Sequence, residues 1–209
     1  PVAISAVVDE PERRRLNDGK CGPDGRLYFG TMRRKPEIGI AALYRMDRDL
    51  SVRSLIQGVT VSNGLAWDPA RRTMYYIDTQ TNRVDAFDWI SATGAIANRR
   101  PAVEFLDAPG QPDGMCIDRE GNLWVALWGG GCVQRVDPRT GELLGRVTVP
   151  AELVTSCCFG GPDLKDLYIT TARIGLSANE LERQPGAGDI FHVRSEVPGL
   201  PCDLFRGNV

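Results

Sequence analysis

The chain has 209 residues and a formal charge of −2, which is enough for one sizeable domain. The 25 basic and 27 acidic residues are mixed along the chain, and the longest basic run is Arg13–Arg15, so the composition argues against a nucleic-acid partner. No stretch approaches the roughly 18 consecutive apolar residues of a membrane-spanning helix, and the first residues carry no export signal. We therefore expect a cytoplasmic protein with no membrane partner and a single domain over residues 1–209.

The apolar segments are short runs of β-branched and aromatic residues bounded by Gly, Pro, Asp or Asn, which is the pattern of β-strands. In chain order they predict an outer strand at 2–8, a group of four at 65–68, 73–78, 83–89 and 103–106, a second group at 115–118, 123–128, 133–137 and 144–149, and a last strand at 189–193. Helical character is limited to residues 177–183, where Ser177 precedes Glu180 as in a capping box. We predict an all-β chain.

The strands follow a repeat. Four similar segments each open a unit, and the reference residues Gly19, Gly64, Gly114 and Cys157 are spaced by 45, 50 and 43 residues. A period near 45 residues with about four strands per unit is typical of a β-propeller, in which each unit is one blade. We therefore predict a β-propeller with about four blades in this chain.

Each unit carries a side-chain oxygen directly before its reference residue: Asp18, Asn63, Asp113 and Ser156. In a propeller the first strand of each blade lines the central channel, so these positions would converge. Asn-Gly and Asp-Gly are also the commonest tight-turn pairs, but their recurrence in register favours the channel. A ring of such oxygens suits Ca²⁺, Mg²⁺ or Mn²⁺, and a carboxylate can also hold Zn²⁺.

Other hydrolytic systems find little support in the sequence. His192 is the one histidine and lies in the expected terminal strand, where we interpret it as structural. A Ser-His-Asp or Cys-His system would depend on that single histidine, and neither a nucleophile elbow nor a phosphate-binding loop occurs. Hydrolytic chemistry here would therefore be assisted by a metal.

Six motifs occur in order along the chain: Arg15-Leu-Asn17-Asp18-Gly-Lys, Phe29-Gly-Thr-Met32, Val61-Ser-Asn63-Gly-Leu, Tyr75-Tyr-Ile-Asp78, Pro112-Asp113-Gly-Met-Cys-Ile-Asp118 and Ser156-Cys-Cys-Phe-Gly-Gly161. Together they resemble the regucalcin (senescence marker protein) and gluconolactonase family. The resemblance runs over nearly the whole chain in the right order.

This resemblance implies a six-bladed type of propeller with one divalent metal ion and lactonase activity on aldono-1,5- or 1,4-lactones such as gluconolactone. The family's metal ligands are a Glu near its N-terminus, the Asn that corresponds to Asn63, and the Asp that corresponds to Asp113. Arg15 and Asn17 correspond to residues that contact the substrate. Asp113 would also orient or deprotonate the attacking water.

The chain also departs from the family pattern. It starts well inside that pattern, so the N-terminal Glu ligand has no counterpart, and Glu37 is the nearest candidate for a second acidic residue that meets substrate. We expect an open arc of blades rather than a closed four-bladed ring, with uncovered blade faces that favour self-association. Two alternatives to the lactonase stay open: a non-catalytic, regucalcin-like calcium-binding propeller, and an inactive truncated fragment.

Overall fold

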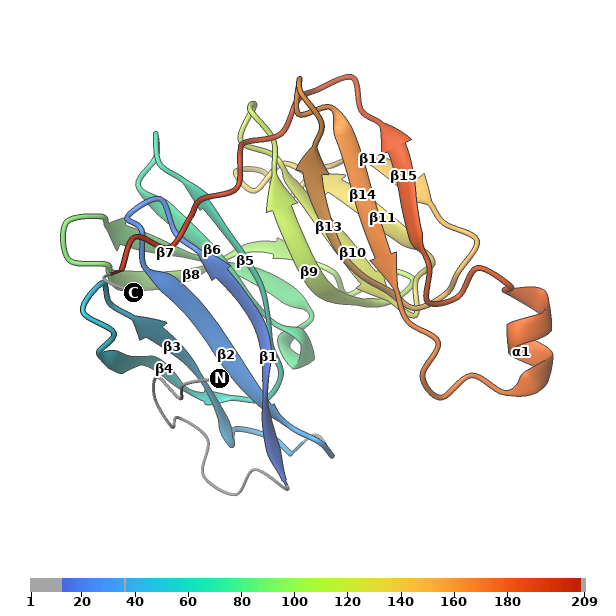
Figure 1. The fold of residues 1–209 in the computed structure, drawn as a ribbon, viewed down its shortest axis with the longest axis horizontal. Helices are drawn as coiled ribbons and strands as arrows, with labels where there is room; N and C mark the ends of the chain where they lie inside the picture. Colours follow the sequence, from blue (N-terminus) through green and yellow to red (C-terminus); the bar gives the residue numbers. More distant parts are fainter. Residues whose placement is uncertain (1–12, 36, 208–209) are drawn as a thin grey trace. The chain divides into compact units, whose positions relative to one another are not determined.

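Antiparallel β-sheets make up the structure, a computed structural model that describes residues 13–35 and 37–207 (Figure 1). Four sheets follow one another along the chain, each formed by consecutive strands, as expected for propeller blades. The prediction of an all-β chain with about four blades is confirmed. The strand expected at 2–8 lies outside the described residues.

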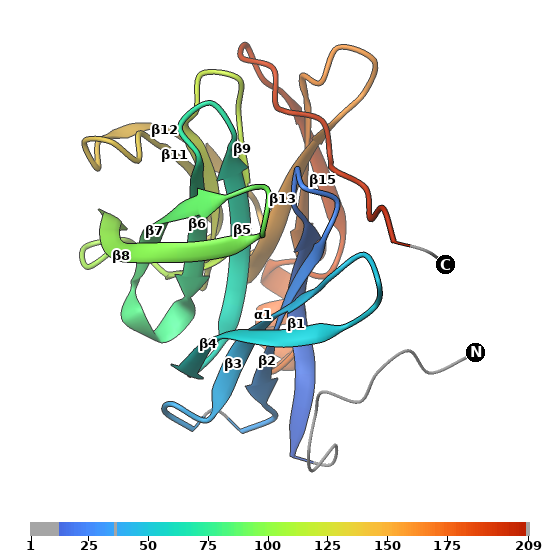
Figure 2. The ribbon, with the colours of Figure 1, turned by 90° about the vertical axis from the view of Figure 1, so that its left-hand side faces the viewer.

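Blades 1 and 2 are complete four-stranded sheets in which each strand pairs with the next (Figure 2). Blade 1 consists of β1 (Arg14–Cys21), β2 (Leu27–Arg33), β3 (Ala41–Met46) and β4 (Val52–Val59), and blade 2 of β5 (Ser62–Asp68), β6 (Thr73–Asp78), the 3-10 turn η1 (Thr79–Thr81), β7 (Arg83–Ile90) and β8 (Ala95–Glu104).

Blade 3 has four strands and blade 4 has three among the described residues. Blade 3 consists of β9 (Gln111–Ile117), β10 (Leu123–Trp128), β11 (Cys132–Val136) and β12 (Leu143–Thr148), and blade 4 of β13 (Val154–Gly160), β14 (Asp166–Thr171), the helix α1 (Ala178–Arg183) and β15 (Ile190–Arg194).

Two of the sequence predictions can be compared directly with these elements. The capping box at α1 is present: Ser177 Oγ accepts from the Glu180 N–H, and the Glu180 carboxylate accepts from the Ser177 N–H. The outer strand of blade 2 was predicted too late, because β8 ends at Glu104 and Leu106 is exposed. The middle of β8, residues 97–101, is exposed and carries Asn98, Arg99 and Arg100, so its hydrophobic pattern does not mark it as a strand.

The chain divides into two compact units, and each is described by itself. One unit contains residues 13–81 (without 36), 85–100 and 202–207, and the other contains 82–84 and 101–201. Each has its own apolar core. In the first, Tyr28, Leu43, Leu65 and Met74 from blades 1 and 2 are fully buried; in the second, Trp124, Phe159, Leu167 and Ile169 from blades 3 and 4 are buried.

Within each unit the inner strands of the two blades approach each other closely at a glycine. A Cβ on Gly30 of β2 would collide with the Ser62 side chain of β5, and a Cβ on Gly114 of β9 would collide with the Ser156 side chain of β13. Neither glycine has a positive φ. These glycines are therefore required by close packing rather than by a turn.

We expect Gly30→Ala and Gly114→Ala each to destabilise the fold by about 1–3 kcal/mol, because the added methyl overpacks a blade contact. Gly145→Ala is the matched control, since a Cβ on this β12 residue meets no atom within 4 Å. Urea denaturation of the three variants measures the effect. Equal stability of all three would contradict this account of the packing.

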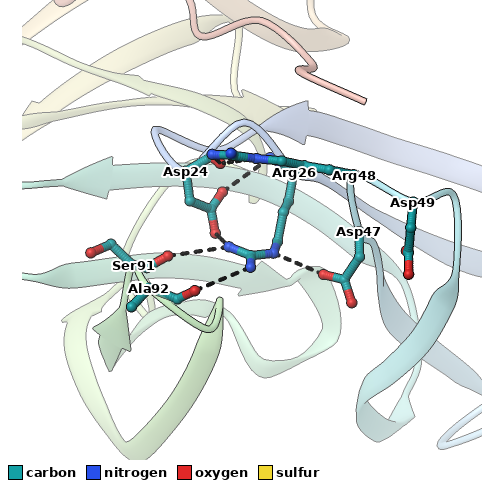
Figure 3. Close-up of a pocket in the computed structure, with 7 residues that line it drawn as sticks. All are labelled: Asp24, Arg26, Asp47, Arg48, Asp49, Ser91 and Ala92. Atoms are coloured by element: carbon teal, nitrogen blue, oxygen red, sulfur yellow. Dashed lines mark hydrogen bonds and ion pairs between the residues drawn. The ribbon is translucent and has the colours of Figure 1, made fainter. Parts of the chain in front are cut away.

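An ion-pair network joins the strand-connecting turns of blades 1 and 2 around a cavity of about 600 Å³ (Figure 3). The Arg26 guanidinium donates to Asp24 Oδ2 (2.9 Å) and Asp47 Oδ1 (2.8 Å), and also to the carbonyl oxygens of Ser91 and Ala92, both at 3.2 Å. Arg45 makes a further ion pair with Asp47 at 2.7 Å. One arginine of blade 1 thus holds the β7–β8 turn of blade 2.

Because of this network, the stability of the fold should fall as the solution becomes acidic. Burial by itself would raise the pKa of Asp47, but Arg45 and Arg26 outweigh burial and hold that pKa below its ordinary value. A carboxyl whose pKa is lowered by folding stabilises the protein above its unfolded-state pKa of about 3.9, and the stabilisation is lost as the pH falls through the folded-state value.

We expect Asp47→Asn to lower the free energy of unfolding at pH 7 by about 2 kcal/mol, because two arginines lose a charged acceptor. The deficit should shrink as the pH falls below about 4. Denaturation measured from pH 3 to 7 tests this, with Asp107→Asn, at an exposed turn position, as the control. A deficit that does not change with pH would contradict the role given to the charge.

Candidate metal and substrate site

A β-bulge interrupts the first strand of every blade at or beside the position picked out by the repeat. In β1, Asn17 and Asp18 stand opposite the single residue Gly30, because Leu16 pairs with Thr31 and Gly19 with Phe29. The same two-against-one pairing occurs at 63–64 in β5 and 113–114 in β9, and Thr155 is the extra residue in β13. Bulges of this kind re-aim side chains next to functional sites.

The bulges correct one of the two sequence interpretations. Asn63-Gly64 and Asp113-Gly114 lie inside strands, not in tight turns, and neither glycine has the positive φ that a hairpin turn of this type requires. Asp18, Asn63 and Asp113 thus lie in bulges of their strands, whereas Ser156 is paired with Thr170 and directly follows the bulged residue Thr155. Their convergence on one channel stays a prediction, since Asp18 and Asn63 belong to one unit and Asp113 and Ser156 to the other.

A chain of side-chain hydrogen bonds links the bulges of blades 1 and 2. Asn17 Nδ2 donates to the backbone carbonyl of Ser62 and to Asn63 Oδ1, both at 2.8 Å. Asn63 is buried, and its Nδ2 donates to Thr79 Oγ1 at 2.7 Å. The structure thus brings together Asn17 and Asn63, which are two of the four predicted site residues.

The Ser62 carbonyl determines which way the amides of Asn17 and Asn63 are turned in this series of hydrogen bonds. A carbonyl can only accept, so the Asn17 group that faces it must be Nδ2, and the Asn63 atom that faces the same Nδ2 must be the oxygen. Asn63 Nδ2 then faces Thr79, whose hydroxyl accepts. Asn17 Oδ1 has no partner among the residues that the structure describes, so Asn17 offers an acceptor.

Buried polar groups around β5 support this arrangement. The Asp78 carboxylate accepts from the N–H groups of Thr60 and Val61, both at 3.0 Å, and the Tyr76 hydroxyl donates to Ser62 Oγ at 2.8 Å. Burial raises the pKa of Tyr76, which keeps its phenol protonated as a donor. The segment that carries Asn63 is therefore held at both backbone and side-chain atoms.

Two further residues of β1 lie close in sequence but differ in environment. Arg15 is exposed and donates to the neighbouring Leu16 carbonyl at 3.0 Å; no contact with Asn17 or Asn63 is described. Asp18 is half-buried, and burial raises its pKa in spite of the Lys20 charge and the Gly19 N–H, which lower it. A desolvated carboxylate of this kind gains stability from a cation.

Asp113, the predicted catalytic residue and metal ligand, is half-buried in the β9 bulge. Glu37 is exposed and makes an ion pair with Arg33 at 2.6 Å, and His192 lies on β15, 2.8 Å from Asp166. The bond to Asp166 agrees with the structural role expected for His192.

The donor chemistry suits a hard divalent cation. Asn63 presents an amide oxygen with one lone pair engaged by Asn17 and one remaining, which is a kind of donor that such a cation binds. Within residues 13–35 and 37–207 there is no cluster of three or more His, Cys, Asp or Glu side chains placed to hold a metal.

Sequence reasoning missed Thr79 and Asp78 as parts of the site. Asp78 closes the Tyr-Tyr-Ile-Asp motif, but its acidic side chain turns inward to backbone N–H groups, and Thr79 lies outside the repeat positions. The signal available in the sequence was only that Asp78 ends a buried strand and that Thr79 directly follows it.

Comparison with known proteins agrees with this class of fold, a β-propeller. Residues 2–173 match the family model described as SMP-30/Gluconolactonase/LRE-like region. The regucalcin of Danio rerio is 49% identical over 209 residues, which cover 99% of this chain and 71% of that protein. The chain therefore belongs to the SMP-30/gluconolactonase family.

Two solved structures give the same result. A calcium-binding protein, regucalcin, from Agrobacterium tumefaciens has a TM-score of 0.87 at 32% identity and is matched by 92% of this chain over 65% of its own. A gluconolactonase from Xanthomonas campestris has a TM-score of 0.61 at 29% identity, with 74% and 53% covered. The chain thus spans only part of each solved relative.

The described residues contain no helix with the length and apolar character needed to cross a membrane.

We expect Asp18→Asn to stabilise the protein at pH 7 in the absence of metal, because the variant removes a charge whose desolvation is unfavourable. A raised folded-state pKa means that the penalty is absent below the unfolded-state pKa of about 3.9 and present above the folded-state value, so the gain should vanish at low pH. Thermal unfolding in a chelator measures it. Asp88→Asn is the control of opposite sign, because Asn98 and Arg100 lower the pKa of this exposed carboxyl; a destabilised Asp18→Asn would contradict the prediction.

Proposed function

We propose that this chain belongs to a metal-dependent lactonase that hydrolyses sugar lactones such as gluconolactone, with one divalent ion, Ca²⁺, Zn²⁺, Mn²⁺ or Mg²⁺, as cofactor. The observation that carries the proposal is the Asn17–Asn63–Thr79 chain, which presents two amide oxygens from adjacent bulges. Membership of the family and the equivalent bulge at Asp113 support it.

The residues would divide the chemistry among them. A bound divalent ion would supply a Lewis acid for the lactone carbonyl. Asn63 Oδ1 and the Asp113 carboxylate would hold the ion. Asp113 would accept a proton from the attacking water as the water oxygen bonds to the carbonyl carbon. When the ring C–O bond breaks, that proton would pass to the leaving ring oxygen.

Substrate hydroxyls would be bound by residues of β1. Asn17 would accept a hydroxyl hydrogen with Oδ1, since both N–H bonds of its amide are already used within the protein. Arg15, an exposed guanidinium, would donate to further hydroxyls or to the lactone oxygens. On this proposal Asn17 contacts the substrate as a hydrogen-bond acceptor.

A second candidate is a calcium-binding propeller without turnover. The relative from Agrobacterium tumefaciens is described as a calcium-binding protein, and oxygen ligands of the kind found here suit Ca²⁺. Metal binding without hydrolysis would favour this candidate, while hydrolysis that is lost in chelator and restored by metal would favour the lactonase.

We expect Asp113→Asn to lower kcat/KM for glucono-1,5-lactone by about 100-fold or more, because the variant cannot accept the proton. Asn63→Ala should instead weaken metal binding, so that activity returns in part at high metal concentration. Acid release is followed after chelation and after addition of Mn²⁺, Zn²⁺ or Ca²⁺.

Asp88→Asn, an exposed substitution on β7 of blade 2, is the control for both variants. Unchanged turnover in Asp113→Asn together with unchanged metal binding would overturn the proposed role. A folded chain with neither turnover nor metal binding would correspond to the inactive fragment.

A further inference from the structure

We infer that Thr79 is a positioning residue for metal binding: its hydroxyl holds the Asn63 amide in the orientation that turns Oδ1 toward the cation. The inference rests on the proposed function, because it assumes that Asn63 is a ligand. Nothing in the sequence motifs assigned a role to this residue.

Thr79 occupies a fixed place relative to Asn63. It is buried, begins η1 directly after β6, and its backbone N–H donates to the Val61 carbonyl at 3.1 Å. The preceding residue, Asp78, binds the N–H groups of Thr60 and Val61. These hydrogen bonds connect Asp78 and Thr79 to residues on both sides of Ser62. The position of Thr79 Oγ1 is therefore fixed relative to β5.

The hydroxyl is the partner that completes the Asn63 amide. Oδ1 already accepts from Asn17, and Nδ2 is left to donate to Thr79 at 2.7 Å. A buried N–H without a partner costs free energy. Without the hydroxyl the Asn63 amide would be held on one side only, by the bond from Asn17 to Oδ1, so Oδ1 would be less firmly fixed in the direction that a cation needs.

The proposed role of Thr79 requires a hydrogen-bond acceptor at this position. This requirement distinguishes it from a role in packing alone. Valine has nearly the shape of threonine but cannot accept, whereas serine keeps the hydroxyl and loses a methyl group. Partners that orient metal ligands typically change metal affinity by 10–100-fold when they are removed. The valine variant should therefore bind metal more weakly, and the serine variant should bind like the wild type.

The test is calorimetric titration of the metal-free full chain with Mn²⁺ and with Ca²⁺ alone. We expect Thr79→Val to weaken binding by about 10–100-fold, Thr79→Ser to bind within a few-fold of the wild type, and Asn63→Ala to lose binding. Thr73→Val is the matched control, because Thr73 is also buried and its hydroxyl donates to the Arg71 carbonyl. It should bind metal as the wild type does.

Thermal unfolding of the metal-free variants separates positioning from general stability. If Thr79→Val and Thr73→Val lose similar stability and only Thr79→Val loses affinity, the inference is supported. If Thr79→Val does not fold, Thr79→Cys takes its place, since a thiol is a weak acceptor; wild-type affinity in that variant would overturn the inference.

The remaining outcomes distinguish the inference from the function on which it rests. Wild-type affinity in Thr79→Val, together with lost binding in Asn63→Ala, would overturn the role of Thr79 and leave the proposed function intact. Wild-type affinity in Asn63→Ala, or a wild-type chain that binds no metal, would overturn the proposed function and the inference with it.

Discussion

The Ser62 backbone carbonyl is the acceptor on which the candidate site depends. Backbone carbonyls cannot reverse their polarity, so this one oxygen orders every amide in the chain from Asn17 to Thr79. Two asparagines that could each turn either way are thereby held with their oxygens available. Preorganisation of this kind removes the cost of turning ligands when a cation or a hydroxyl binds.

The contact between Asn17 and Ser62 is possible because Gly30, which lies next to it, has no side chain. Gly30 stands opposite the β1 bulge, and its lack of a Cβ allows Ser62 of β5 to approach β2. The bulge turns Asn17 toward that approach, and the adjacent bulge carries Asn63 to meet it. The close packing at Gly30 and the bulges in β1 and β5 thus act together to bring polar side chains of the two blades into contact.

Two carboxylates of the first unit, Asp47 and Asp18, have pKa values that are shifted in opposite directions. In the ion-pair network, Asp47 is compensated by arginines, and its pKa falls. In β1, burial raises the pKa of Asp18, because the desolvation of its carboxylate is only partly compensated. The compensated network stabilises the fold, whereas the charged form of the carboxylate beside Asn17 is disfavoured by its burial.

The sequence by itself determined the all-β class, the repeat of four blades and the residues at its register positions, because alternation and spacing are local properties. It also placed α1, whose capping box needs only Ser177 and Glu180.

Only the tertiary structure decided that Asn63-Gly64 is a bulge, that Asn17 offers an oxygen and that Thr79 completes the hydrogen bonds of the Asn63 amide. These depend on contacts between residues of different strands, such as Asn17 with Ser62, and the direction of a side chain at a bulge is set by its partner strand. The outer strand of blade 2 was predicted too late for a related reason, since pairing with β7 rather than its own hydrophobicity holds the exposed middle part of β8.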